Sequence, residues 1–171
     1  DVNMTITNNL TISTYENANV IIDAEKKGYI FYDDNINNAL NIIGLTFTNA
    51  TGYIMGDGLF GGAIFSNAKL NIINSTFNYN TATYGGAVLS STYGNIINST
   101  FNYNTATYGG ALVFETFGLI NGSYFYNNTA SKSAGAIVFD ECGGIISNSE
   151  FINNKALNEG VIPPTINVDN Q

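Results

Sequence analysis

The sequence contains no histidine and no arginine, so five lysines supply all of its side-chain positive charge. Thirteen acidic residues outweigh these lysines and give a formal net charge of −8. Nucleic-acid-binding domains carry clusters of lysine and arginine that neutralise phosphates. The charge balance therefore argues against nucleic acid as a partner.

Cysteine and long apolar runs are also scarce. Cys142 is the only cysteine, which excludes an internal disulfide framework and predicts an inert, packed thiol. No apolar run approaches the roughly 20 residues that span a bilayer, and the first residues show no signal-peptide pattern. We expect no membrane insertion by this segment. Because it opens with the strand-like DVNMTITNN, we interpret it as a fragment of a longer chain.

What the sequence has in abundance is repetition. The stretch NIINSTFNYNTATYGGA occupies residues 71–87 and returns unchanged at residues 95–111, which is a period of 24. A similar spacing, with steps of 30, 24, 24 and 26, aligns a column of phenylalanines, Phe47, Phe77, Phe101, Phe125 and Phe151. A similar spacing also aligns a column of asparagines, Asn80, Asn104, Asn128 and Asn154. A fixed period of 20 to 50 residues is typical of a solenoid.

The composition of the repeat decides which solenoid is predicted. Ile, Val, Thr, Phe, Tyr, Asn and Gly dominate, no helical stripe is present, and the L-x-x-L-x-L run of leucine-rich repeats is missing. Each unit splits into three short apolar pieces separated by Asn, Ser and Gly, which favour turns. We predict an all-β fold, a right-handed single-stranded parallel β-helix with about 24 residues per coil and about seven coils.

Domain boundaries follow from where the repeat is regular. Residues 1–162 are expected to form the β-helix domain, in which residues 1–43 supply irregular opening coils and residues 44–162 the repeat coils. Residues 163–171 begin with two prolines, which cannot continue a ladder. We interpret them as an exit linker toward a further module.

Stacked coils place like residues over like residues, about 4.8 Å apart. The phenylalanines are therefore expected to stack in a dry interior, and the asparagines to pass side-chain hydrogen bonds from coil to coil. The glycine pairs, such as Gly85-Gly86, are expected at tight bends where a Cβ would collide.

The paired motifs GGA[I/V/L] and FxxN, present as GGAIF, FNYN, GGAVL, GGALV, FYNN and FINN, carry a family resemblance. They are similar to the repeats of chlamydial polymorphic membrane proteins. They resemble still more the β-helical, Asn- and Thr-rich adhesin-like surface proteins of methanogenic archaea, over about residues 10–160. The resemblance implies an extracellular, cell-surface rod that binds something outside the cell and is one domain of a longer, surface-anchored chain. It transfers no catalytic residues. FTNA at 47–50 and EGV at 159–161 depart from the pattern, so the asparagine ladder is expected to break near both ends.

Recurring tyrosines suggest how such a rod would bind a surface protein or carbohydrate of another cell. The candidates lie one coil apart and are Tyr79, Tyr84, Tyr103 and Tyr108. Rows of tyrosine rings can stack on sugars or anchor an interface. The alternative is that the rings pack only on each other and stiffen the rod.

The period is interrupted once, between Phe47 and Phe77, where the step is 30 residues. The extra residues lie in TGYIMGDGLF, residues 51–60. Insertions in solenoids form loops that often carry binding residues. Tyr53, Met55 and Asp57 are therefore candidates for ligand contact.

Asparagine-linked glycosylation is a third expectation. Seven Asn-x-Ser/Thr sequons occur, at Asn3, Asn9, Asn49, Asn74, Asn98, Asn121 and Asn127. A chain so rich in Asn, Ser and Thr produces some of them by chance, so they favour an extracellular location only modestly.

The alternative function is a polysaccharide-active enzyme, because β-helices include lyases and glycosidases. Such enzymes need a basic residue beside a carboxylate-bound Ca²⁺, or two or three converging carboxylates. Here the adjacent acids are the pairs Asp33-Asp34 and Asp140-Glu141, which we expect to be solvated at corners. No catalytic residue, metal site or cofactor is predicted.

Overall fold

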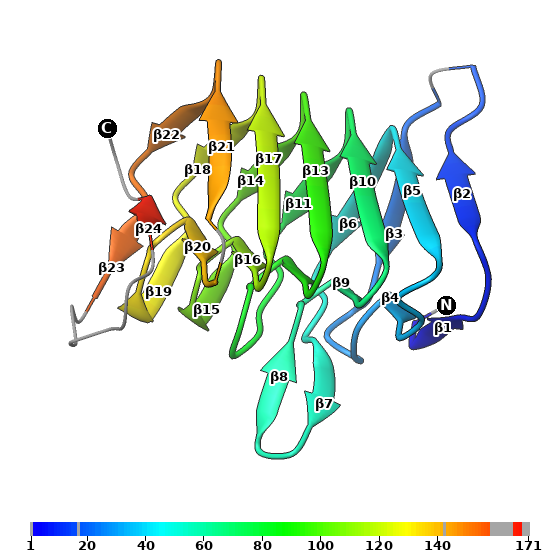
Figure 1. Ribbon diagram of the computed structural model, residues 1–171, viewed down its shortest axis with the longest axis horizontal. Helices are drawn as coiled ribbons and strands as arrows, with labels where there is room; N and C mark the ends of the chain where they lie inside the picture. Colours follow the sequence, from blue (N-terminus) through cyan, green and yellow to red (C-terminus); the bar gives the residue numbers. More distant parts are fainter. Residues whose placement is uncertain (1, 17, 142, 158–165, 169–171) are drawn as a thin grey trace.

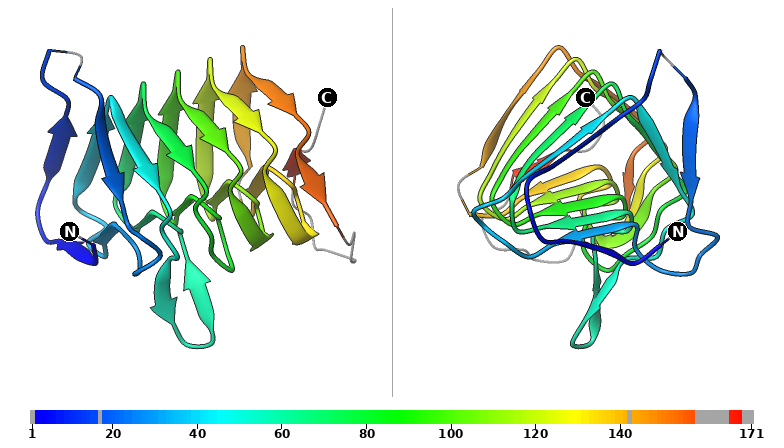
Figure 2. Two further views of the ribbon diagram at one scale, coloured as in Figure 1. Left: turned by 180° about the vertical axis from the view of Figure 1, so that it is seen from behind. Right: turned by 90° about the vertical axis from the view of Figure 1, so that its right-hand side faces the viewer.

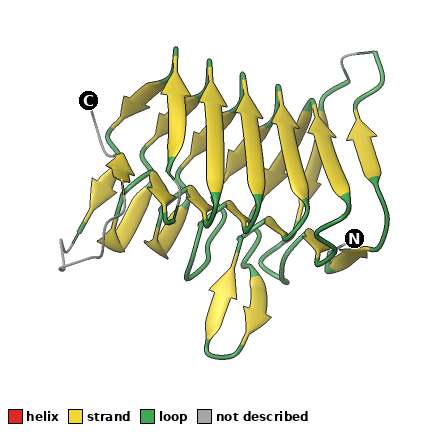
Figure 3. Ribbon diagram, viewed as in Figure 1, coloured by secondary structure: helices red, strands yellow, loops and turns green. Residues whose placement is uncertain are grey.

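The computed structural model describes residues 2–16, 18–141, 143–157 and 166–168, which form strands, turns and loops but no helix (Figure 3). The chain winds into a parallel β-solenoid of about 6 turns with roughly 25 residues per turn. Seen from its N-terminal end, the chain turns clockwise as it recedes from the viewer, so the solenoid is right-handed (Figure 2, right). The predicted β-helix is confirmed, with about one turn fewer than the chain length suggested.

Three sheets run along the solenoid and enclose its interior (Figures 1 and 2). The first sheet contains β1 (Met4–Ile6), β4 (Phe31–Asp33), β9 (Ile64–Ser66), β12 (Val88–Ser90), β16 (Leu112–Phe114), β20 (Ile137–Phe139) and β24 (Ile166–Val168). The second contains β2 (Leu10–Ser13), β5 (Ala39–Ile43), β10 (Lys69–Ile73), β13 (Tyr93–Ile97), β17 (Phe117–Asn121) and β21 (Gly144–Ser147). The third contains β3 (Val20–Asp23), β6 (Leu45–Thr48), β11 (Thr76–Asn78), β14 (Thr100–Asn102), β18 (Tyr124–Tyr126) and β22 (Glu150–Ile152).

The phenylalanine column lies at the centre of the hydrophobic core. Strand pairing places Phe77 beside Phe101 and Phe101 beside Phe125. Their ring centroids are 4.9 Å apart and their planes are parallel to within 4°. Phe47 and Phe151 extend the stack at its two ends. All five rings are buried, so the column removes its apolar surface from water while keeping the favoured stacked geometry.

The asparagine column forms a ladder inside one corner of the solenoid. Asn80 donates from Nδ2 to Asn104 Oδ1, Asn104 to Asn128, and Asn128 to Asn154, at 2.9 to 3.0 Å. Each of the four also donates to a phenylalanine carbonyl of the coil before it. The ladder starts at Asn80, because Ala50 takes this position in the previous coil and donates only its backbone N–H. Residues 159–161, where the other break was expected, lie outside the described residues.

Each regular coil bends at three corners, where one residue has a positive φ. In the first copy of the repeated stretch these residues are Asn74 (50°), Tyr79 (57°) and Gly85 (63°). Asparagine and glycine tolerate this left-handed conformation better than most residues, which accounts for their recurrence. Beside Gly85, a Cβ on Gly86 would lie 2.1 Å from the carbonyl oxygen of Gly110. The glycine pair thus serves both the turn and the close approach of two coils.

Two features lie outside the three-sided coil. A fourth, short sheet consists of β15 (Thr105–Tyr108), β19 (Thr129–Ser133) and β23 (Lys155–Ala156), where the repeat had predicted only a turn. The insertion between Phe47 and Phe77 forms an antiparallel hairpin, β7 (Tyr53–Met55) and β8 (Gly58–Phe60). This hairpin projects away from the solenoid (Figure 1).

The two ends of the solenoid differ in strand pairing. Near the N-terminus, β1, β2 and β3 pair in parallel with the next coil. Near the C-terminus, β24 pairs antiparallel with β20, so part of the predicted exit linker adds a strand to the first sheet. Cys142 and the remaining linker residues, 163–165 and 169–171, lie outside the described residues. In the described residues no helix is long and apolar enough to cross a membrane.

Candidate functional site

A second hydrophobic cluster, separate from the core, covers the outer face of the first sheet. Side chains alternate along a strand, so Ile64 of β9 joins the core while Phe65 joins this outer cluster. Leu89 and Val113 occupy the equivalent outward positions on β12 and β16. The strands of this sheet are consequently buried on both faces from β9 to β20.

Aromatic rings continue this cluster toward the N-terminal end. We call them the aromatic band, which consists of Tyr29, Tyr53, Tyr32, Phe65, Phe60, Tyr84 and Tyr108. Successive rings in that order have centroids 4.1 to 5.8 Å apart. The hairpin contributes a ring from each of its strands, Tyr53 from β7 and Phe60 from β8. These contacts anchor the base of the hairpin to the solenoid.

The predicted pair Tyr84 and Tyr108 lies within the aromatic band. Phe60 stacks on Tyr84 at 5.0 Å, and Tyr84 stacks on Tyr108 at 5.1 Å. Lys132 Nζ lies 5.7 Å from the centroid of the Tyr108 ring. A sugar ring needs an open aromatic face, and the faces within this stack are already covered. The arrangement supports the interpretation that this pair stiffens the rod.

The predicted pair Tyr79 and Tyr103 lies at a corner, apart from the band. The two rings are stacked at 5.2 Å with planes 10° apart, and they are 57% and 50% exposed. Among the described residues their ring contact is with each other. Only the two outer faces of this short stack are therefore open to a ligand.

The hairpin places the other three predicted residues differently. Tyr53 is half-buried at its base, Met55 is 49% exposed at the end of β7, and Asp57 is exposed in the turn. Ile54, which the sequence did not single out, is 74% exposed. Soluble surfaces carry single exposed apolar side chains routinely. Ile54 and Met55 are neighbours on β7, so they expose apolar surface on opposite faces of the projecting hairpin. We call these two side chains the apolar tip.

A cavity of ≈ 470 Å³ opens between the base of the hairpin and the turn that precedes β4. Its lining includes Tyr29 and Tyr53, Ile54 and Leu59 of the hairpin, Lys26 and Lys27, and Asn3 and Thr51. We call it the hairpin pocket. The Tyr29 and Tyr53 rings meet at 66°, so they form two walls of a corner and not a stack. The volume falls within the range of small-molecule sites.

The charges near the hairpin pocket come from one turn of the chain. A side-chain hydrogen bond to Glu25, reinforced by its charge, raises the pKa of Lys27, which stays protonated at neutral pH. Behind Tyr53, burial is the main cause that raises the pKa of Tyr32 to about 12. Tyr32 is therefore neutral at physiological pH, and the two lysines supply the positive charge of the pocket.

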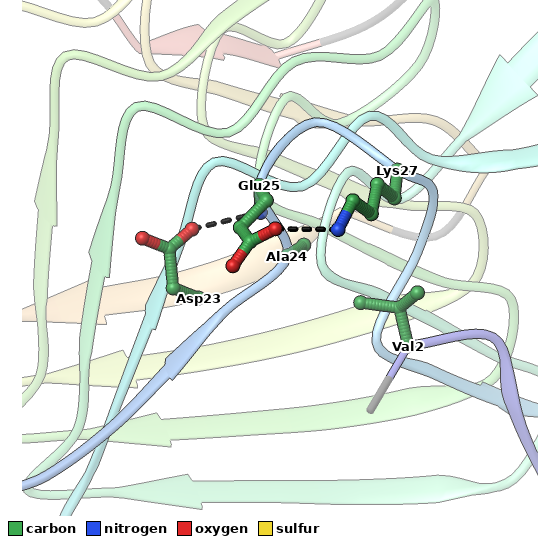
Figure 4. Close-up of a pocket in the computed structure, with 5 residues that line it drawn as sticks. All are labelled: Val2, Asp23, Ala24, Glu25 and Lys27. Atoms are coloured by element: carbon green, nitrogen blue, oxygen red, sulfur yellow. Dashed lines mark hydrogen bonds and ion pairs between the residues drawn. The ribbon is translucent and has the colours of Figure 1, made fainter.

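A neighbouring pocket of ≈ 450 Å³ contains two carboxylates, those of Asp23 and Glu25 (Figure 4). The backbone N–H of Glu25 donates to Asp23 Oδ1, and with a hydrogen bond from Asn49 it lowers the pKa of Asp23. Glu25 forms an ion pair with Lys27. A glycosidase needs one carboxyl group that stays protonated to act as general acid. These contacts instead favour the ionised form of Asp23, and they pair Glu25 with a cation.

The adjacent acid pairs have different surroundings from those expected. Asp33 is fully buried and accepts hydrogen bonds at Oδ1 from Asn35 and Asn38, so the expectation of a solvated Asp33 is wrong. It is buried because it occupies an inward position of β4. Asp34, Asp140 and Glu141 are exposed. Across the described residues no group of three or more His, Cys, Asp or Glu side chains could hold a metal ion.

The seven sequon asparagines lie at or near the surface. Asn3, Asn9, Asn74, Asn98 and Asn121 are exposed, whereas Asn49 and Asn127 are half-buried. Asn49 donates from Nδ2 to Asp23, so its amide already has a protein partner. Asn74 and Asn98 occupy the same left-handed corner in adjacent coils. The side chains that would carry a glycan are therefore more accessible at the five exposed asparagines than at Asn49 and Asn127.

Sequence reasoning missed the residues that complete the hairpin pocket, Lys26, Lys27 and Tyr29. They precede the regular repeats, so no column marks them. One signal was available in the cluster KKGY, where two lysines of five adjoin a glycine and a tyrosine. It also missed the serines Ser75, Ser99 and Ser123, which bond coil to coil at another corner. Their signal was a serine that recurs every 24 residues, in INST at 73–76 and 97–100 and in NGSY at 121–124.

Comparisons of this chain with protein-family models, with curated proteins and with solved structures found no match.

Proposed function

We propose that this chain is a noncatalytic, extracellular, adhesin-like module, a rod on the cell surface that binds a carbohydrate or a surface protein of another cell. The observation that carries the proposal is the hairpin with its adjoining pocket. It interrupts an otherwise uniform solenoid, and the core does not require it. The family resemblance of the repeats supports the same role and location.

The hairpin has the construction of a display element. Tyr53 and Phe60 fix its base to the aromatic band, while Ile54 and Met55 leave apolar surface in solvent. The hairpin is thus already ordered before a ligand binds, and this reduces the conformational entropy that is lost on binding. Apolar side chains surrounded by polar surface are typical of interaction sites.

The proposal is tested by removing the apolar tip without disturbing its base. The double variant Ile54→Ser, Met55→Ser is compared with wild type for retention on a glycan array and on a panel of intact cells. We expect wild type to bind at least one surface and the variant to lose roughly tenfold in affinity. Ile145→Ser is the matched control, since Ile145 is 56% exposed on β21. If wild-type protein is retained on none of these surfaces, the proposal is overturned.

An enzyme is the competing function, and it makes a different prediction. Wild-type protein is incubated with pectin, alginate and chitin oligomers, and the products are separated by size. We expect no cleavage, because the carboxylates of the pocket in Figure 4 are held ionised or paired. Shortened products from any substrate would contradict the noncatalytic proposal.

A further inference from the structure

We infer that the hairpin pocket binds an acidic sugar, a ring that carries a carboxylate or a sulfate group. The inference rests on the proposed function and specifies its ligand class. It starts from the charges of the pocket. Lys26 and Lys27 are two of the five lysines in the chain, and no acidic side chain is among the residues that line this pocket. In a protein with net charge −8, such a site is a local exception.

The two lysines differ in how strongly they are already neutralised. Lys27 forms its ion pair with Glu25, and both side chains are about two-thirds exposed, so this pair is weak. Lys26 makes no ion pair within the described residues. An anion in the pocket would therefore meet at least one uncompensated ammonium group. Exposed charges of this kind are screened by salt, so binding should weaken as ionic strength rises.

The backbone holds these lysines in a fixed turn. Glu25 and Lys26 have φ of 50° and 59°, and Asn3, across the pocket, has φ of 61°. Unlike the left-handed residues at the repeating corners, these three belong to no column. The turn is closed by Lys26 N–H to Asn49 O and Lys27 N–H to Ala24 O, both at 2.8 Å. Costly backbone conformations kept in place by surrounding contacts are typical of binding sites.

The uncharged walls favour a sugar over a simple anion. Tyr53 is stacked on Tyr32, whereas Tyr29 meets Tyr53 at 66° and Tyr32 at 80° and is stacked on neither. We therefore assign stacking on the sugar to Tyr29 and the side wall to Tyr53. Asn3 and Thr51 supply an amide and a hydroxyl for hydroxyl groups. A sugar ring with one acidic substituent uses all three kinds of group at once.

The test uses paired ligands that share their sugar rings and differ in the charge of the acidic group. Trigalacturonate is the carboxylate probe, and its methyl ester keeps the ring shape without the charge. A sulfated galactose trimer separates sulfate from carboxylate recognition. Binding is measured by calorimetry at low and at physiological ionic strength. We expect at least one acidic trimer to bind, its affinity to fall with salt, and the ester to bind roughly tenfold more weakly.

Variants locate the site. Lys26→Gln with Lys27→Gln should lower the affinity for the acidic trimer roughly tenfold or more and leave the methyl ester unaffected. Lys132→Gln with Lys155→Gln makes the same change of charge elsewhere and should leave binding as in wild type. Equal binding of acid and ester, or an equal loss in both double variants, would overturn the inference. If no acidic sugar binds while wild type still adheres in the tip assay, the inference fails and the proposed function stands. If adhesion is also absent, the proposed function fails.

Discussion

Two inner corners of the solenoid are filled in different ways: one repeats the same side chain from coil to coil, and the other does not. At the asparagine corner, the coils from Asn80 to Asn154 use one side chain without variation. At the corner between the first and second sheets, the side chain changes along the rod. Here Asp33, Ser66 and Ser90 are followed by Phe114 and Phe139, in one continuous register.

At the corner between the first and second sheets, which we call the variable corner, large and small side chains alternate between the two sheets. Where the first sheet has the small Ser66, the second sheet carries Leu70. Where the first sheet has Phe114, the second sheet has Gly94 and Gly118, and a Cβ on either would lie 2.3 or 2.6 Å from the Phe114 ring. Volume-conserving exchanges are tolerated in cores. A column whose side chains bond from coil to coil must repeat its chemistry, whereas a column whose polar members bond only within their own coil can change from Asp33 and Ser66 to Phe114.

The largest effect is expected at the asparagine corner. Asn104→Ala removes the bonds of Asn104 to Phe77 O and to Asn128, and leaves the N–H of Asn80 without its acceptor. Buried groups left unpaired are costly, so we expect a loss of about 4 kcal/mol in the free energy of unfolding. Urea denaturation measures it. Asn102→Ala is the control, because Asn102 bonds to Asn78 on the outer face. It should lose about 0.5 kcal/mol, and similar losses in both variants would abolish the distinction between the corners.

An intermediate effect tests the volume exchange at the other corner. Gly94→Leu alone should crowd the Phe114 ring, and Phe114→Ser alone should leave a cavity. The double variant recreates the Ser66 and Leu70 arrangement one coil further along. We expect its destabilisation to be smaller than the sum of the two single losses by about 2 kcal/mol. Denaturation of the three variants measures this coupling, and strict additivity would refute the exchange.

The smallest effect separates two serines of the variable corner. Ser66 Oγ bonds with the N–H and the carbonyl of Ala68, whereas Ser90 Oγ is buried without a hydrogen-bond partner among the described residues. Ser66→Ala should therefore destabilise the fold by about 1 kcal/mol, and Ser90→Ala by less than about 0.5 kcal/mol. Thermal unfolding followed by circular dichroism compares the two. A larger loss from Ser90→Ala would mean that its hydroxyl has a partner after all.

The fold was predictable because stacking imposes a visible period. Phe77 and Phe101 must occupy the same place in adjacent coils, so the sequence repeats them at the spacing of one coil. The number of coils was overestimated by about one. The hairpin residues 53–60 account for about a third of that excess, because they add length without adding a turn. The fourth sheet was missed because Thr105–Tyr108 lies between the turn residues Asn104 and Gly109 and contains one aliphatic residue, Ala106. Its threonines and tyrosine do favour a strand, and the burial of Ala106 marks it as packed.

The candidate site was predictable only in part, for a related reason. Tyr53 was found because its insertion interrupts the period. Lys26 and Tyr29 could not be found this way, since they belong to a turn that occurs once. These residues lie near Tyr53 only because the base of the hairpin packs against the aromatic band. Tyr84 and Tyr108 show the opposite case, in which a strong repeat marked residues whose rings already cover each other.

Because adjacent coils superimpose residue for residue, the length of the rod can change in whole units. Removing residues 95–118 would join Gly94 to Leu119. Because Gly94 pairs with Gly118, the joined strand would keep the register that the coils already have. The identical stretches at 71–87 and 95–111 show that two neighbouring coils can share one sequence. Loss or gain of one such coil would shorten or lengthen the solenoid by one strand separation, about 4.8 Å.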